Sequence, residues 1–223
     1  MAATGPFDLV IFDLDGVLVD SEPLSAAALV AEAAACGIAL TAEEVRRDFL
    51  GRSFVTVAAG LRARAGAGFP PDFEARYRAR LFAAFERALR PVPGTAAMLD
   101  GVGLPWRIAT SSTPARAATA LRIAGLAVRA GDRVDTASEV ARGKPAPDLF
   151  LLSAARAGVR PARCVVVEDS APGIRAARAA CMASILFLGG GHHRGRPWDG
   201  PPPSLGAIGA WDALPALLGR VAE

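Results

Sequence analysis

The sequence predicts an α/β protein with a doubly wound parallel sheet and a separate helical domain inserted after the first strand. Short apolar runs recur along the chain, and each ends at a polar or glycine-containing turn. Such continuous apolar character is typical of strands buried on both faces of a parallel sheet. Helical stretches alternate with these runs, which indicates βαβ units. By contrast, residues 20–90 are rich in Ala, Leu, Glu and Arg and poor in β-branched residues, which favours a helical bundle.

The first strand is predicted at residues 9–12, immediately before the acidic turn Asp13-Leu14-Asp15-Gly16. Glycines and prolines divide the segment that follows into about four helices, and a Pro-Gly turn at 91–94 marks the return to the sheet. Later strands are predicted at 106–109, 164–167 and 184–188, with helices at 114–124, 147–157, 172–181 and 211–221 and a loop at 189–206. We therefore expect a core domain of residues 1–19 and 91–223 and a helical domain of residues 20–90.

The composition limits which side chains can carry chemistry. Lys144 is the only lysine among 25 basic residues, and the only two histidines, His192 and His193, are adjacent. A Ser-His-Asp triad or a zinc site would therefore need this pair. Because the pair lies in a glycine-rich segment, we expect it to belong to a flexible loop; contact with substrate is the alternative. Three well-separated cysteines argue against a disulfide framework or a thiolate metal site.

Charge and hydropathy indicate the kind of partner. The net charge is +3 and the isoelectric point is about 9.1. No arginine block with interleaved aromatic residues marks a nucleic-acid surface, so a small anionic partner is favoured. No apolar stretch approaches the roughly 18 residues of a membrane span, and no secretory signal is recognised. We expect a cytoplasmic protein with no nucleic acid, no membrane and no obligate protein partner.

The polar residues at the predicted strand ends form the candidate site. Ligands of an open parallel sheet bind beyond the carboxyl ends of its strands. Carboxylates repel phosphate unless a cation intervenes, and oxygen ligands of this type suit Mg²⁺. Hydroxyl and ammonium groups then hold the remaining phosphoryl oxygens, so the set favours phosphoryl transfer. The set comprises Asp13, Asp15, Thr110, Ser111, Glu168 and Asp169 at strand ends and Lys144 in a loop.

Four segments resemble, in order, the four motifs of the haloacid dehalogenase superfamily. They are Phe12-Asp13-Leu14-Asp15-Gly16-Val17-Leu18, Thr110-Ser111-Ser112, Gly143-Lys144-Pro145 and Val167-Glu168-Asp169-Ser170. The segment Leu18-Val19-Asp20-Ser21-Glu22-Pro23, followed by a helical insertion, is similar to the branch of that superfamily with a helical cap. That branch contains β-phosphoglucomutase and many sugar-phosphate phosphatases. The resemblance implies a Rossmann-like core, with residues 20–90 as the cap.

The resemblance also implies catalytic and metal-binding roles. Asp13 would be the nucleophile that becomes an aspartyl phosphate, and Asp15 would be the general acid and base. Asp13, the main-chain carbonyl of Asp15 and Asp169 would bind Mg²⁺, with Glu168 a ligand or a residue that supports one. For Asp15 to act as an acid, we expect neighbouring carboxylates to raise its pKa.

The resemblance assigns phosphate binding and substrate selection to other residues. Ser111, Ser112 and Lys144 would orient and neutralise the transferring phosphoryl group. The loop residues Arg52 and Ser53 resemble the substrate-specificity loop of the cap.

These assignments predict a Mg²⁺-dependent phosphatase that acts on a small phosphorylated metabolite, either a sugar phosphate or a sugar-acid phosphate. Two related reactions are disfavoured: Asp15 is not needed for dehalogenation, and residues 20–90 contain no lysine for the Schiff base of phosphonate hydrolysis. A phosphosugar mutase remains an alternative, although Pro23-Leu24-Ser25 lacks the histidine of β-phosphoglucomutase. A phosphoacceptor signalling domain is less favoured, because such domains are shorter and have no inserted cap.

Overall fold

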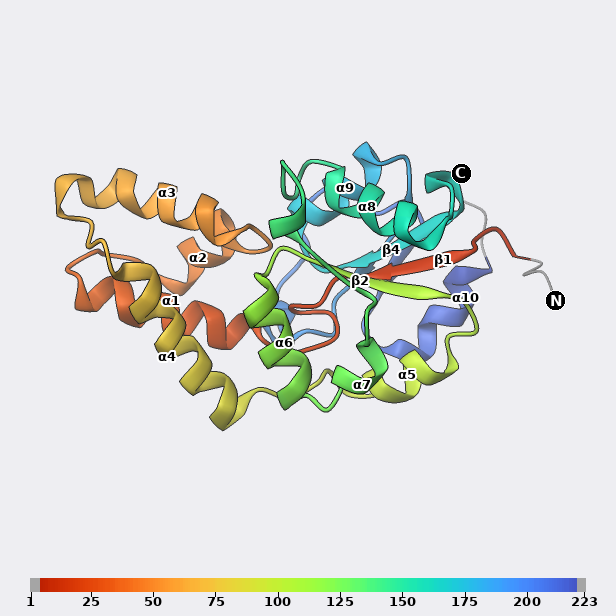
Figure 1. Cartoon of the computed structure of the whole chain (residues 1–223), viewed down its shortest axis with the longest axis horizontal. Coiled ribbons are helices and arrows are strands. Elements are labelled where there is room, and N and C mark those ends of the chain that lie inside the picture. Colours follow the sequence, from red (N-terminus) through yellow and green to blue (C-terminus); the bar gives the residue numbers. More distant parts are fainter. Residues whose placement is uncertain (1–4, 220–223) are drawn as a thin grey trace.

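The computed structural model describes residues 5–219, which contain a six-stranded parallel sheet with helices on both faces (Figure 1). The strand order is β3-β2-β1-β4-β5-β6, and every neighbouring pair is parallel. The strands are β1 (Leu9–Phe12), β2 (Trp106–Thr110), β3 (Val134–Thr136), β4 (Cys164–Glu168), β5 (Ala183–Phe187) and β6 (Gly206–Ile208). The predicted doubly wound α/β fold is confirmed.

Strand β1 is central, and its alternating side chains separate the two halves of the core. Val10 and Phe12 pack into one apolar cluster, and Leu9 and Ile11 pack into the other, all fully buried, because successive side chains of a strand point to opposite faces. Helices α8 (Asp148–Ala157) and α9 (Ala171–Ala179) cover the second face. The first face is covered by helices α5 (Thr95–Gly101), α6 (Pro114–Ile123) and α10 (Leu214–Leu218).

Four further helices lie at one end of the molecule, away from the two termini (Figure 1). They are α1 (Glu22–Ala35), α2 (Ala42–Phe49), α3 (Phe54–Ala65) and α4 (Phe73–Ala88). Helix α1 packs along α4 and also against α2. A capping box between Thr41 and Glu44 begins α2, which satisfies two backbone donors at the helix start.

Several short elements differ from the expectations. Strands β3 and β6 and helices α5 and α7 (Ala127–Ala130) were not predicted, since each is too short to show a periodic pattern. Strand β6 begins at Gly206, the last residue of the predicted loop. Helix α10 is shorter than the predicted helix 211–221, whose last two residues lie outside the described part of the chain.

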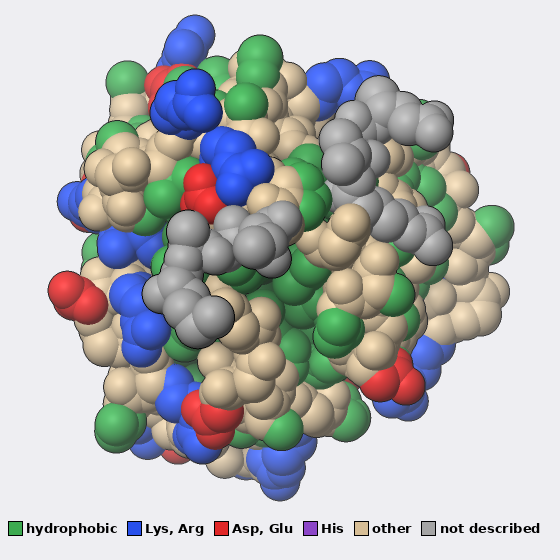
Figure 2. Space-filling view, turned by 90° about the vertical axis from the view of Figure 1, so that its right-hand side faces the viewer, with side chains coloured by type: hydrophobic (Ala, Val, Ile, Leu, Met, Phe, Trp, Pro, Cys, Tyr) green, Lys and Arg blue, Asp and Glu red, His purple; other side chains and the backbone are tan. Residues whose placement is uncertain are grey.

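The end of the molecule opposite α1–α4 has a mixed surface. Basic side chains there are spread around the rim of the face, with acidic side chains among them (Figure 2). Among residues 5–219, no helix combines the length and the apolar character needed to cross a bilayer.

Candidate active site

The carboxyl ends of β1, β2 and β4 meet at the centre of the sheet and bring the predicted residues together. The register pairs Phe12 with Ile108 on one side and with Val167 on the other. The backbone N–H of Asp13 then donates to the carbonyl of Val167 at 2.9 Å. The turns after the three strands therefore start at the same level, as expected where ligands bind in an open parallel sheet.

Lys144 lies between two buried carboxylates. Its Nζ donates to Asp13 Oδ1 at 2.5 Å, to Glu168 Oε2 at 2.7 Å and to the carbonyl of Ala109 at 3.0 Å. Burial opposes the charged form, but the two carboxylates hold the pKa of Lys144 above its usual value. Burial raises the pKa of Asp13 well above its usual value; Lys144 opposes this shift, and the charges of Glu168 and Asp169 add to it.

Asp15 has a different environment, although it is only two residues away. It accepts hydrogen bonds from Ser21 and Ser112 at 2.6 Å each and from Arg116 at 2.8 Å. Burial raises its pKa, but the charge of Arg116 and these hydrogen bonds outweigh burial and leave the pKa of Asp15 lowered. The expectation that neighbouring carboxylates raise this pKa is therefore wrong, because the guanidinium is the closest charge.

Asp13, Glu168 and Asp169 each offer a carboxylate oxygen, and the three oxygens lie within 4.8 Å of one another. All three residues are buried. Glu168 is also bound by Lys144 and by the hydroxyl and N–H of Ser170. A buried set of oxygen donors with excess negative charge fits a hard divalent cation such as Mg²⁺.

Gly16 allows the first turn to approach Asp169. Its φ is +80°, and a Cβ at this position would lie 2.0 Å from Asp169 Oδ2 and 2.8 Å from His192 Cε1. Glycine is required here both for the left-handed backbone and for space.

The histidine pair lies beside Asp169 and does not stand apart from the site as a flexible loop would. His192 Nε2 is 3.0 Å from Asp169 Oδ2, and His193 Nε2 is 3.0 Å from the main-chain oxygen of Asp169. Burial lowers the pKa of both imidazoles, that of His193 to about 4. The glycines around the pair, which had indicated flexibility, instead allow close packing: a Cβ at Gly190 would lie 2.6 Å from the carbonyl oxygen of Gly16.

The predicted phosphate-binding hydroxyls have separate partners. Ser111 donates to the carbonyl of Gly51 at 3.1 Å, which joins the core to the loop between α2 and α3. Ser112 donates to Asp15. Ser53 lies at the start of α3, where its Oγ is 3.3 Å from Thr56 Oγ1.

A pocket opens between the sheet edge and the helical bundle. Core residues form one wall and bundle residues form the other, and Arg52 lies on the bundle side. The lining includes Asp13, Asp15, Ser111, Ser112 and Arg116 from the core and Glu22, Arg52, Phe54, Tyr77 and Arg78 from the bundle.

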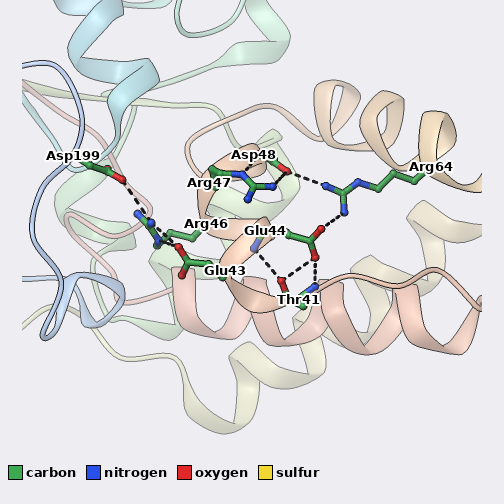
Figure 3. Close-up of polar contacts among 8 residues, drawn as sticks. All are labelled: Thr41, Glu43, Glu44, Arg46, Arg47, Asp48, Arg64 and Asp199. Atoms are coloured by element: carbon green, nitrogen blue, oxygen red, sulfur yellow. Dashed lines mark hydrogen bonds and ion pairs between the residues drawn. The ribbon is translucent and has the colours of Figure 1, made fainter.

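Ion pairs hold α2 against its neighbours (Figure 3). Arg46 contacts Glu43 at 2.7 Å and Asp199 of the loop after β5 at 3.7 Å, and Arg196 of that loop contacts Glu43 at 2.5 Å. On the other side, Arg64 of α3 reaches both Glu44 and Asp48 of α2. Exposed pairs are individually weak, about 0–1 kcal/mol each. Two of them, Arg46 with Asp199 and Arg196 with Glu43, join the bundle to the core beside the loop that carries Arg52.

Sequence reasoning missed Arg116, Ser21 and Glu22 as site residues. Arg116 is in the first turn of α6, directly after the hydroxyl-rich end of β2. Its place in that turn was the available signal, because the start of a helix that follows a strand faces the same edge of the sheet.

A family model described as haloacid dehalogenase-like hydrolase matches residues 7–180. Hexitol phosphatase A from Escherichia coli (strain K12) is 36% identical over 175 residues, which cover 76% of this chain and 78% of that protein. A phosphoglycolate phosphatase from Xylella fastidiosa (strain 9a5c) is 35% identical over 188 residues, which cover 81% and 80%. Protein SUPPRESSOR OF QUENCHING 1, chloroplastic, from Arabidopsis thaliana is 31% identical over 191 residues (81% of this chain), and the match spans only 18% of its length.

Solved structures have the same architecture. A HAD family hydrolase from Deinococcus radiodurans R1, with bound phosphate and sodium, matches with a TM-score of 0.71 and 33% identity. The match covers 96% of this chain and 98% of that one.

Proposed function

This chain belongs to the haloacid dehalogenase-like hydrolases, and we propose that it is a Mg²⁺-dependent phosphatase acting on a small phosphomonoester, either a sugar phosphate or a sugar-acid phosphate. The observation that carries the proposal is the pocket in which Asp13 and Asp15 face residues of the helical bundle. The names of the similar phosphatases, which include a hexitol and a phosphoglycolate phosphatase, support a small organic phosphate as the substrate.

In the proposed reaction Asp13 attacks the phosphorus atom of the ester, so that a bond from its carboxylate to phosphorus forms as the bond to the alcohol oxygen breaks. In its protonated form, Asp15 gives that proton to the departing oxygen and becomes ionised, and it later removes a proton from the water that hydrolyses the aspartyl phosphate. The contacts that lower the pKa of Asp15 favour its second role, as a base. Ser112 and Arg116 then act as positioning residues for Asp15.

Asp13 and Asp169 are the carboxylates proposed to hold Mg²⁺, together with the main-chain carbonyl of Asp15 and with Glu168 as a support. The chemistry supplied by the bound cation is positive charge beside the transferring phosphoryl group. Lys144 keeps Asp13 oriented from the buried side through its 2.5 Å hydrogen bond. Ser111 is proposed to orient the phosphoryl group when its hydroxyl leaves the carbonyl of Gly51.

We propose that residues 20–90 form a cap domain that selects the substrate, with residues 1–19 and 91–223 as the catalytic domain. Arg52 is an exposed cation that lines the pocket, so it suits a distal hydroxyl, carboxylate or second phosphate of the substrate. Closure of such a cap also excludes bulk water. Ser53 is proposed to support this loop as the first residue before α3.

The test is phosphate release from p-nitrophenyl phosphate and a panel of sugar and sugar-acid phosphates, with Mg²⁺ and with EDTA. We expect Mg²⁺-dependent turnover of several esters and none by the Asp13→Asn variant. No turnover above that variant would reject the proposal. Chromatography of the products separates the two remaining alternatives: a mutase returns an isomeric sugar phosphate without free phosphate, and a phosphoacceptor domain labels itself once.

A further inference from the structure

Three buried polar atoms beside Asp169 have no hydrogen-bond partner among the described residues. They are Oδ2 of Asp169 and both ring nitrogens of His192. The side chains of the two residues are 3% and 7% exposed. Nε2 and Oδ2 are 3.0 Å apart, but their relative direction is not that of a hydrogen bond. Buried polar atoms are nearly always satisfied, so the adjacent pair of His192 Nε2 and Asp169 Oδ2 points to a ligand that both atoms contact.

The separation of these atoms fits two ligands of one cation. Metal–nitrogen and metal–oxygen bonds of about 2.1 Å at a right angle place the two ligand atoms about 3.0 Å apart. His193 offers a third ligand atom, and one such atom from each of Asp169, His192 and His193 lies within 4.8 Å of the others. The contact of His193 Nε2 with the main-chain oxygen of Asp169 holds its ring beside the same residue, as outer partners do for metal-bound histidines.

The backbone is shaped to hold the histidines in this position. Gly190 precedes the turn, and a Cβ on it would lie 2.8 Å from His192 Cε1. The N–H of Gly191 donates to Asp20 Oδ1 at 2.8 Å, which ties the turn to the segment before α1. Together with Gly16, these contacts press the imidazole of His192 against Asp169.

We propose that Asp169, His192 and His193 form a second metal site, which binds a divalent transition-metal cation in preference to Mg²⁺. Two imidazoles and one carboxylate suit Mn²⁺, Co²⁺ or Zn²⁺, whereas Mg²⁺ prefers oxygen ligands alone. The site shares Asp169 with the carboxylate group of Asp13 and Glu168, and neither histidine belongs to that group. The proposal goes beyond the phosphatase reaction, in which the histidines play no part.

The test measures metal binding by the full chain, without an affinity tag and freed of metal. Co²⁺ is titrated and followed by its visible absorption, and nitrogen coupling to bound Mn²⁺ is measured by pulsed electron paramagnetic resonance. Because the chain has only two histidines, any histidine nitrogen coupling comes from this pair. We expect coupling in the wild type and at least a tenfold weaker Co²⁺ affinity in His192→Asn, because even the loss of an outer partner of a metal ligand costs roughly 10–100-fold.

Asp13→Asn is the matched control, since it alters only the carboxylate group. It should keep both the nitrogen coupling and the Co²⁺ absorption. An absence of nitrogen coupling in the wild type would overturn the proposal and leave His192 as an ion-pair partner of Asp169. Unchanged Co²⁺ binding in His192→Asn, or loss of it in Asp13→Asn, would also overturn the proposal. If His192→Asn fails to fold by circular dichroism, the wild-type coupling and the His193→Asn variant decide. No readout depends on turnover, so the outcome is independent of the phosphatase assay.

Discussion

Replacement of Lys144 by methionine tests the electrostatics of the buried site. The side chains of Lys144, Asp13 and Glu168 are 1%, 8% and 1% exposed, so the variant leaves two carboxylates buried without their cation. Breaking a buried ion pair in this way costs about 3–5 kcal/mol. For a chain of this size, 1 kcal/mol shifts Tm by roughly 2–4 °C, so Tm should fall by roughly 6–20 °C at neutral pH.

The loss of stability in Lys144→Met should depend on pH, and the pKa shifts of Lys144 and Asp13 predict the direction. The raised pKa of Lys144 means that its contribution is constant below the ordinary lysine pKa of about 10.4. In Lys144→Met the pKa of Asp13, already raised, rises further because the opposing charge is gone. When the pKa of a carboxyl group is higher in the folded protein than in the unfolded chain, the folded protein loses stability as the pH rises. The loss begins at the ordinary aspartate pKa of about 4 and continues until the pH passes the pKa of the folded protein. The variant should therefore be least impaired near pH 4 and most impaired at neutral pH.

The measurement is urea unfolding of wild type, Lys144→Met and Lys144→Arg in EDTA at several pH values between 4.5 and 8. Lys144→Arg is the control because it keeps the charge. The wider guanidinium of Lys144→Arg overpacks the site, which costs roughly 1–3 kcal/mol of stability, and this cost should change little between pH 4.5 and 8. The same variant should lose most of the phosphatase activity. Equal destabilisation of Lys144→Met at pH 4.5 and 7.5, or a loss below about 1 kcal/mol at pH 7.5, would refute the reasoning.

Three further predictions concern residues around the pocket. Arg116→Met should raise the pKa of Asp15, because the positive charge that lowers it is lost, so the limb of the rate profile set by Asp15 moves to higher pH; an unmoved limb contradicts the assignment. Gly16→Ala and Gly37→Ala both force a left-handed residue, at about 1–2 kcal/mol each, but only Gly16→Ala meets side chains. Urea unfolding and Mg²⁺ titration should therefore show a larger loss of stability and of Mg²⁺ affinity for Gly16→Ala than for Gly37→Ala. Arg52→Ala should raise KM for sugar phosphates about tenfold, the effect of losing about 1.4 kcal/mol of binding, and leave KM for p-nitrophenyl phosphate unchanged. Equal effects on both substrates would argue against a role in substrate selection.

The central strands could be predicted from the sequence because their apolar character is continuous. Val165, Val166 and Val167 of β4 are fully buried, so every position carries the signal. Strand β3 pairs only three residues with β2 and lies at an edge of the sheet, where the pattern is too short to separate from a loop. The strand-end carboxylates followed from the fold, because the topology alone brings these ends together.

The residues that set the pKa of each carboxylate could not be predicted in the same way. Arg116 is one of 24 arginines, and although its place in the first turn of α6 directs it to this edge of the sheet, the local sequence does not show that it reaches Asp15. The position of Arg116 beside Asp15 depends on tertiary packing: α6 contacts α4, and the guanidinium of Arg116 lies over the ring of Phe85 in α4. The environment of His192 could not be predicted either, since it depends on a contact between the loop at Gly191 and Asp20, which are 171 residues apart in the sequence.

The opposite pKa shifts of Asp13 and Asp15 follow from how positive charge is distributed. Arg116 pairs with Asp15, whereas Lys144 pairs with both Asp13 and Glu168 and its charge also acts on Asp169. Three carboxylates and one ammonium leave an excess of two negative charges, which is why burial and mutual repulsion raise the pKa values of Asp13 and Asp169. A divalent cation supplies the two missing charges, so its binding and the ionisation of Asp13 are one linked equilibrium. Cation affinity should then increase with pH through the titration of Asp13.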